Sequence, residues 1–148
     1  MSKERYERRI QLAQETGAPF GVGSYTQGII LIVGEQASNP EDAPEQQPFC
    51  TTKGCSGWLN KMLEIESIPE EALFWVNALN NDSTNIDLQK LVDELKPTCV
   101  LALGSVADQV CTEQGVTHEK IYHPQYWKRF RSKERYPLLD RLKQLTDL

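Results

Sequence analysis

Four side chains with the chemistry to read and release a planar base are spread along the chain: Glu35, Phe49, Asn77 and His123. An aromatic ring can stack on a base, and a carboxamide has the donor and the acceptor that the Watson–Crick edge of a pyrimidine requires. A histidine can stabilise negative charge on a departing base. A carboxylate can orient a water molecule or stabilise an oxocarbenium-like sugar. These residue types predict a nucleobase pocket if the fold brings them together.

Each of these residues also has a simpler structural interpretation. Glu35 could be a solvated loop carboxylate or an acid at a helix start, and Asn77 could satisfy neighbouring backbone inside a sheet. His123 could be a surface turn residue, and Phe49 could belong to the core. The elements that carry the four side chains decide between these interpretations.

The hydrophobic pattern predicts strands that alternate with helices. Continuous apolar runs indicate buried strands at residues 29–33, 73–79 and 98–103, with a short fourth strand at 120–122. Helical patterns are expected at residues 3–15, 56–65, 87–95, 106–113 and 136–146. This order is typical of a mainly parallel sheet covered on both faces. We expect an α/β protein: a three-layer αβα sandwich with a four-stranded, mainly parallel sheet, in one domain spanning residues 1–148.

The ligand site of such a sheet lies beyond the carboxyl ends of its strands. Glu35 follows the first strand, Asn77 is the only polar residue in the apolar part of the second, and His123 follows the fourth. After the third strand, Ser105 is expected to cap a helix whose N-terminus could receive an anion. The residues expected to bind substrate are Gly34, Gln36, Phe49, Asn77 and Ser105.

Charge along the chain is uneven. The net charge of −5 argues mildly against a nucleic-acid partner. Residues 119–135, however, hold six basic and two acidic residues, interleaved with aromatic side chains. Such a run is usually a solvated face, but an aromatic and basic segment can also grip phosphates and fill the gap left by an extruded nucleotide. The residues expected to contact DNA are Tyr126, Trp127, Lys128, Arg129 and Arg131.

In its motifs the chain resembles the uracil-DNA glycosylase superfamily, most closely the iron–sulfur branch found in bacteria and archaea. That branch carries GEAPG, then ED, then PF, a glycine and AG-x-L. The matching segments here are Gly34-Glu35-Gln36-Ala37-Ser38, Glu41-Asp42, Pro48-Phe49, Gly54 and Ser56-Gly57-Trp58-Leu59. Residues 95–107 are similar to the family's RPK-x-I-x-ALG-x-x-A element, and His123-Pro124-Gln125-Tyr126 to its HP-x-Y motif.

The resemblance implies a uracil-DNA glycosylase-like fold and a role for each matched position. Glu35 matches the carboxylate that assists water attack, and His123 the histidine that faces the pyrimidine oxygen. Phe49 matches the base-stacking aromatic, and Asn77 the base-reading amide. The segment after His123 matches a loop that enters the minor groove, with Tyr126 or Trp127 as its wedge.

The sequence departs from this branch at the cluster cysteines. The branch begins with an N-terminal CxxC, whereas the cysteines here are Cys50, Cys55, Cys99 and Cys111, without paired CxxC spacing. We expect no cluster, no metal and no other cofactor. The Gln36-Ala37-Ser38 segment also differs from the family motif. Together these departures fit a divergent member, such as a phage-encoded one.

The expected function is a DNA glycosylase of DNA repair that flips out uracil or a modified pyrimidine, from single- or double-stranded DNA, and removes it by hydrolysis. The alternative is a non-catalytic module on a glycosylase fold that binds a nucleobase, DNA or a protein; a third possibility is an enzyme acting on a free nucleotide. No apolar run approaches the roughly 18 residues of a membrane helix, and the N-terminal residues are too charged for a signal peptide. We expect a cytoplasmic monomer without membrane contact.

Overall fold

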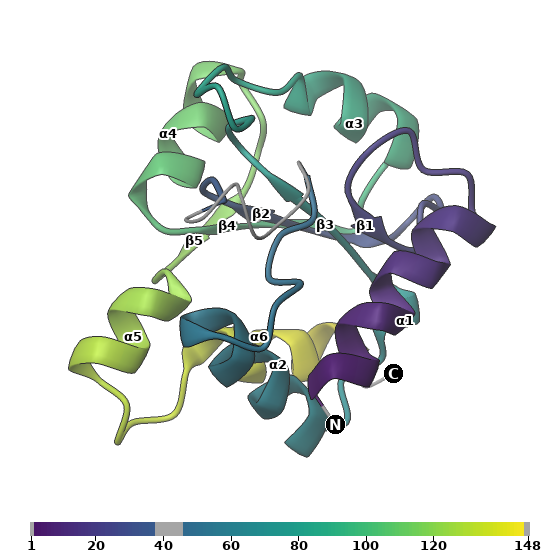
Figure 1. The fold of residues 1–148 in the computed structure, drawn as a ribbon. Helices are drawn as coiled ribbons and strands as arrows, with labels where there is room; N and C mark the ends of the chain where they lie inside the picture. Colours follow the sequence, from purple (N-terminus) through teal and green to yellow (C-terminus); the bar gives the residue numbers. More distant parts are fainter. Residues whose placement is uncertain (1, 38–45, 147–148) are drawn as a thin grey trace.

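The computed structural model describes residues 2–37 and 46–146. Within these ranges, five strands form one sheet in the order β1-β3-β2-β4-β5 (Figure 1). Four strands run parallel to one another: β2 (Ile30–Gly34), β3 (Leu73–Asn77), β4 (Cys99–Leu103) and β5 (Glu119–Ile121). The short strand β1 (Val22–Gly23) pairs with β3 in the antiparallel direction. The α/β class is confirmed.

The expectation of a four-stranded sheet is wrong, because the described sheet is mixed and includes β1 at its edge. This strand is two residues long and lies in a glycine-rich segment, so it carries no alternating or continuous apolar pattern. At Gly23 the backbone has a φ of 107°, and a Cβ atom there would lie 2.4 Å from the carbonyl oxygen of Leu73. Glycine therefore permits a close backbone approach that hydrophobic patterning cannot reveal.

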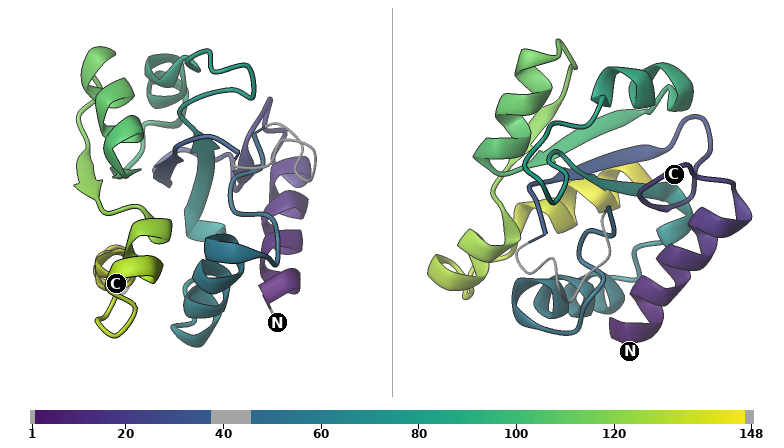
Figure 2. Two further views of the ribbon diagram at one scale, coloured as in Figure 1. Left: turned by 60° about the vertical axis from the view of Figure 1, so that its left-hand side comes forward. Right: turned by 45° about the horizontal axis from the view of Figure 1, so that its top comes forward.

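Helices cover both faces of the sheet and produce three layers (Figures 1 and 2). Helices α3 (Leu88–Leu95) and α4 (Ser105–Glu113) pack on one face. Helices α2 (Gly54–Ile65), α5 (Pro124–Phe130) and α6 (Pro137–Thr146) pack on the other. Helix α1 (Ser2–Glu15) lies beside β1 and contacts α2, and a 3-10 turn, η1 (Glu70–Ala72), precedes β3.

Both faces of the sheet are apolar, as the continuous strand runs predict. In β2, Ile30 and Ile32 belong to the core beneath α2, α5 and α6, whereas Leu31 and Val33 belong to the core beneath α3 and α4. Successive side chains of a strand point to opposite faces, so a strand covered on both sides is apolar at every position. None of the helices in the described ranges is both long and apolar enough to cross a membrane.

Two expectations about the helices need correction. The segment after His123 is not a loop but helix α5, with Pro124 at its first position and the side chain of His123 as its cap. Proline favours the first helical position because its missing N–H would have no partner there. Ser105 does not cap α4: it is the first residue of that helix, and Gly104 is the N-cap with a φ of 95°.

Candidate functional site

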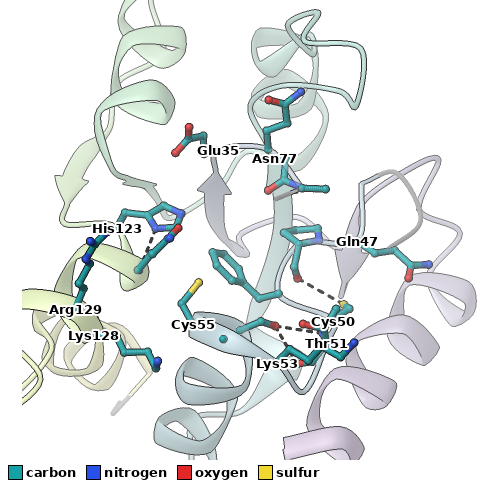
Figure 3. Close-up of a pocket in the computed structure, with 17 residues that line it drawn as sticks. Glu35, Gln47, Cys50, Thr51, Lys53, Cys55, Asn77, His123, Lys128 and Arg129 are labelled. Carbon is teal, nitrogen blue, oxygen red and sulfur yellow. Dashed lines mark hydrogen bonds between the residues drawn. The ribbon is translucent and has the colours of Figure 1, made fainter. Parts of the chain in front are cut away.

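The four parallel strands bring the predicted residues to one edge of the sheet. Gly34 at the end of β2 pairs with Asn77 at the end of β3, and Leu103 pairs with Ile121. An open pocket of about 750 Å³ lies beyond these strand ends (Figure 3). Its volume falls in the range of small-molecule sites. Five predicted substrate or catalytic residues line it: Glu35, Gln36, Phe49, Asn77 and His123.

Asn77 presents a carboxamide that the described protein leaves unpaired. The residue is only 5% exposed. Its backbone N–H donates to Oε1 of Gln46 over 2.8 Å, and Nε2 of Gln46 donates to its carbonyl oxygen over 3.2 Å. Its side-chain amide forms no hydrogen bond with any described residue, and no described side chain holds a fully buried polar atom without a partner. The carboxamide therefore remains accessible from the pocket and available to a ligand.

His123 is held in one neutral tautomer by helix α5. Its Nδ1 accepts a hydrogen bond from the backbone N–H of Gln125 over 3.1 Å, so the proton of a neutral ring belongs on Nε2. Burial lowers the pKa of His123, and the nearby carboxylate of Glu35 opposes this shift. Burial thus favours a neutral imidazole at neutral pH, with an N–H group to donate. Gly104 leaves room for the side chain of His123, because a Cβ atom at position 104 would lie 3.0 Å from Cβ of His123.

Glu35 and Gln36 stand at the rim of the pocket but differ in their contacts. Glu35 is exposed, and its carboxylate forms no hydrogen bond or ion pair with another described residue (Figure 3). The side-chain amide of Gln36 instead donates to the carbonyl oxygen of Asn80 over 2.8 Å and to Oγ of Ser83 over 3.1 Å. Gln36 therefore anchors the loop after β3, whereas Glu35 remains free for a ligand or water.

Phe49 is fixed in an unusual backbone conformation. Its φ is 58°, a left-handed value that costs a non-glycine residue about 1–2 kcal/mol. Its carbonyl oxygen accepts hydrogen bonds from Nδ2 of Asn60 over 2.7 Å and from Nη1 of Arg9 over 3.2 Å. Its ring lies 5.8 Å from the ring of Trp75 and 6.0 Å from that of His123, measured between centroids. These contacts hold an aromatic face on the pocket wall.

A buried ion-pair network supports Phe49 from below, and the sequence analysis missed it. Glu70 accepts two hydrogen bonds from Arg9, of 3.0 and 2.8 Å, and one from Arg5 of 2.6 Å. The indole N–H of Trp75 also donates to Glu70, over 3.0 Å. Burial alone would raise the pKa of Glu70, but the two guanidinium groups lower it. The spacing of Arg5 and Arg9, one helical turn apart, places both on the inner face of α1 with Leu12.

The predicted DNA-binding residues divide between the pocket and the core. Lys128 and Arg129 line the pocket opposite the strand ends. Trp127 is buried in the core, and its indole N–H donates to the carbonyl oxygen of Glu134 over 2.9 Å, so of the two wedge candidates only Tyr126 is exposed. Arg131 is absent from the described pocket lining and pairs with Glu134 over 3.2 Å.

Several other predicted residues lie away from the pocket or fall outside the residues that the structure describes. Ser105 is exposed and is not among the described residues that line the pocket, and Gly34 lies behind Asn77 and Phe49. Ser38, Glu41 and Asp42 fall outside the described residues.

The cysteines at the pocket are not activated as nucleophiles or ligands. Cys50 and Cys55 both line the pocket. Burial raises the pKa of both thiols, that of Cys50 to about 11, which keeps them protonated at neutral pH. Within residues 2–37 and 46–146, no three histidine, cysteine, aspartate or glutamate side chains gather in a group that could hold a metal ion.

No protein-family model and no curated protein matches the chain. What the site can do therefore follows from its own residues. An aromatic face, an unpaired carboxamide and a histidine N–H surround one cavity, with a free carboxylate at the rim and two cationic side chains on the opposite wall. Such a set can hold a planar polar ring and stabilise negative charge on it.

Proposed function

We propose that the pocket receives a pyrimidine flipped out of DNA and that the protein hydrolyses its N-glycosidic bond, as a divergent member of the uracil-DNA glycosylase superfamily with that family's fold. The observation that carries the proposal is the carboxamide of Asn77, which lines the pocket, is accessible from it and has no hydrogen-bond partner among the described residues. A ligand that covers this amide must replace the hydrogen bonds that it makes with water, or binding loses about 1–3 kcal/mol. The Watson–Crick edge of a base would supply such bonds.

Binding of the base uses two further residues. The ring of Phe49 provides the stacking face, and its strained backbone is fixed from below by Asn60 and Arg9. Oδ1 of Asn77 accepts the N3–H of the base, while Nδ2 donates to a ring carbonyl. Lys128 and Arg129 contact the phosphates beside the flipped nucleotide.

Bond cleavage follows from the groups around the bound base. The bond between C1′ of the sugar and N1 of the base breaks, and its electron pair leaves with the base. Nε2–H of His123 donates a hydrogen bond to the carbonyl oxygen of the base on which this negative charge develops. Glu35 orients a water molecule, whose oxygen adds to C1′ and whose proton passes to the carboxylate.

A second candidate function is recognition of a base without hydrolysis. Among the described residues that line the pocket, Glu35 is the only acid, and it is exposed to solvent. Its carboxylate forms no hydrogen bond with another described residue, so no described group fixes it beside a water molecule as a general base requires. The same pocket could then serve to bind a modified base.

The proposal is tested with single-stranded and duplex oligonucleotides that carry uracil or modified pyrimidines, followed by alkaline cleavage at abasic sites. Wild-type protein should generate abasic sites, and Glu35→Gln and His123→Ala should each slow the reaction by about 10²-fold or more. The matched control is Glu71→Gln, an exposed acid on η1 that pairs with Arg8. It should react like wild type.

Binding separates the two candidate functions. Binding without abasic sites, abolished by Asn77→Ala or Phe49→Ala, would replace hydrolysis by recognition. Absence of both binding and cleavage for every base would contradict both.

A further inference from the structure

Three large aromatic side chains form an exposed ladder beside the pocket. Tyr122, Tyr126 and Phe130 are 55%, 39% and 64% exposed. The rings of Tyr122 and Tyr126 are stacked with centroids 5.2 Å apart, and the ring of Phe130 lies 5.2 Å from that of Tyr126. Contiguous exposed apolar side chains on a soluble protein usually mark a binding surface.

The ladder is held in place by the core. Its members are four residues apart in sequence, so Tyr126 and Phe130 lie on one face of α5, and Tyr122 precedes that helix. The buried Trp127 lies beneath, with its ring centroid 5.5 Å from that of Tyr122. This contact restrains Tyr122 directly, and the ring contacts restrain Tyr126 and Phe130 through it, which reduces the entropy lost on binding.

Cationic side chains connect the ladder to the pocket. Lys128 and Arg129 line the pocket, and neither forms an ion pair with a residue that the structure describes. The guanidinium carbon of Arg129 lies 5.3 Å from the ring centroid of Phe130. Arg129 therefore touches both surfaces, on a chain whose net charge is −5.

We propose that the ladder of Tyr122, Tyr126 and Phe130 binds unpaired bases of single-stranded DNA next to the nucleotide held in the pocket. The inference rests on the proposed function in taking DNA as the ligand of the pocket. A phosphate held by Arg129 would link the base in the pocket to the bases on the ladder. Free cations beside the rings favour a nucleic acid over an apolar protein segment, because an apolar partner would leave these charges without compensation.

The geometry selects single strands over duplexes. Bases stack on aromatic side chains only when their faces are open, and in a duplex those faces are covered by neighbouring base pairs. The surface therefore specifies the form of the substrate, independently of the base that enters the pocket.

The test measures fluorescence anisotropy of a short, uracil-free oligonucleotide as a single strand and as a duplex. Wild-type protein should bind the single strand about tenfold or more tightly than the duplex. Phe130→Ala and Tyr126→Ala should each weaken single-strand binding by about tenfold, the usual effect of losing one stacking ring. The matched control is Ile65→Ala on α2, whose side chain is also 64% exposed but lies outside the ladder; its binding should equal that of wild type.

The uracil-free strand distinguishes this inference from the proposed function, because ladder-dependent binding of that strand would stand even if no abasic sites form. Equal affinity for single strand and duplex, or wild-type affinity in both ladder variants, would overturn the inference. A dimer in analytical ultracentrifugation that Phe130→Ala dissociates would assign the ladder to a second copy of the chain and also overturn it.

Discussion

Gly34 and Asn77 lie opposite each other in the paired strands β2 and β3, and a Cβ atom at Gly34 would lie 2.7 Å from Oδ1 of Asn77. The same Cβ atom would lie 3.3 Å from the ring of Phe49. Glycine at position 34 therefore allows the amide and the aromatic ring to occupy one end of the sheet together. Gly34 contributes space to the site rather than a contact with the ligand.

Gly34→Ala should displace the carboxamide of Asn77 while leaving the fold intact. We expect binding of a uracil-containing oligonucleotide to fall by about tenfold or more, as for loss of a hydrogen-bonding group in a buried site. Overpacking should lower the free energy of unfolding by about 1–3 kcal/mol. Anisotropy and urea denaturation measure the two effects. Wild-type binding by Gly34→Ala would mean that the amide does not read the base.

His123 should be neutral and protonated on Nε2 near neutral pH, with a pKa below its ordinary value. Because burial lowers this pKa, the unfolded chain takes up the proton at higher pH than the folded chain does. The free energy of unfolding should therefore fall as the pH drops below about 6.5. Nitrogen-15 NMR of the imidazole reports both tautomer and pKa.

Glu35→Gln tests whether the carboxylate of Glu35 acts on the imidazole of His123. The carboxylate of Glu35 raises the pKa of His123 against the effect of burial, so its removal should lower that pKa further. The relevant signal is the one lost in His123→Gln. A ring protonated on Nδ1, or a pKa that rises in Glu35→Gln, would show that the two side chains are not arranged as described.

Arg9 and Arg8 are neighbours in α1 whose substitution should have very different costs. Arg9→Met leaves the buried carboxylate of Glu70 with one guanidinium instead of two and should lower the free energy of unfolding by about 3–5 kcal/mol. Arg8→Met removes an exposed pair with Glu71 and should cost at most about 1 kcal/mol. Urea denaturation measures both, and equal costs would refute a special role for the buried network.

The sequence predicts where the site lies better than it predicts the contacts that hold the site's side chains in place. Continuous apolar runs identify the buried strands, and parallel strands share one carboxyl edge, so Glu35, Asn77 and His123 could be placed together in advance. Phe49 is different: its position depends on a left-handed backbone and on donors from α1 and α2, which only the tertiary structure brings near. A hydrophobic pattern assigns arginine to the solvent-exposed face of a helix, so it does not predict that Arg9 is buried.

Helix α5 shows a second limit of pattern reasoning. Its seven residues contain two buried ones, Pro124 and Trp127, beside exposed cations and aromatics. A helix this short has too few buried positions to display a 3.6-residue period. The cap at His123 and the proline that follows were the usable signals, and they also determine which nitrogen of the histidine faces the pocket.

The proposed base pocket is tested most directly by asking whether a flipped uracil contacts Asn77. Isotope-labelled protein can be titrated with an oligonucleotide that carries 2′-fluoro-2′-deoxyuridine, because fluorine disfavours the oxocarbenium-like sugar and slows hydrolysis. The side-chain NH₂ signals of Asn77 and the Nε2–H signal of His123 should shift. Those of Asn60, whose amide already bonds to Phe49 over 2.7 Å, should not.

The same titration with an oligonucleotide lacking uracil is the control. It should leave the Asn77 and His123 signals in place while signals of α5 move. If the Asn77 signals do not move with the uracil analogue, under conditions in which the oligonucleotide is bound, this pocket does not read a base.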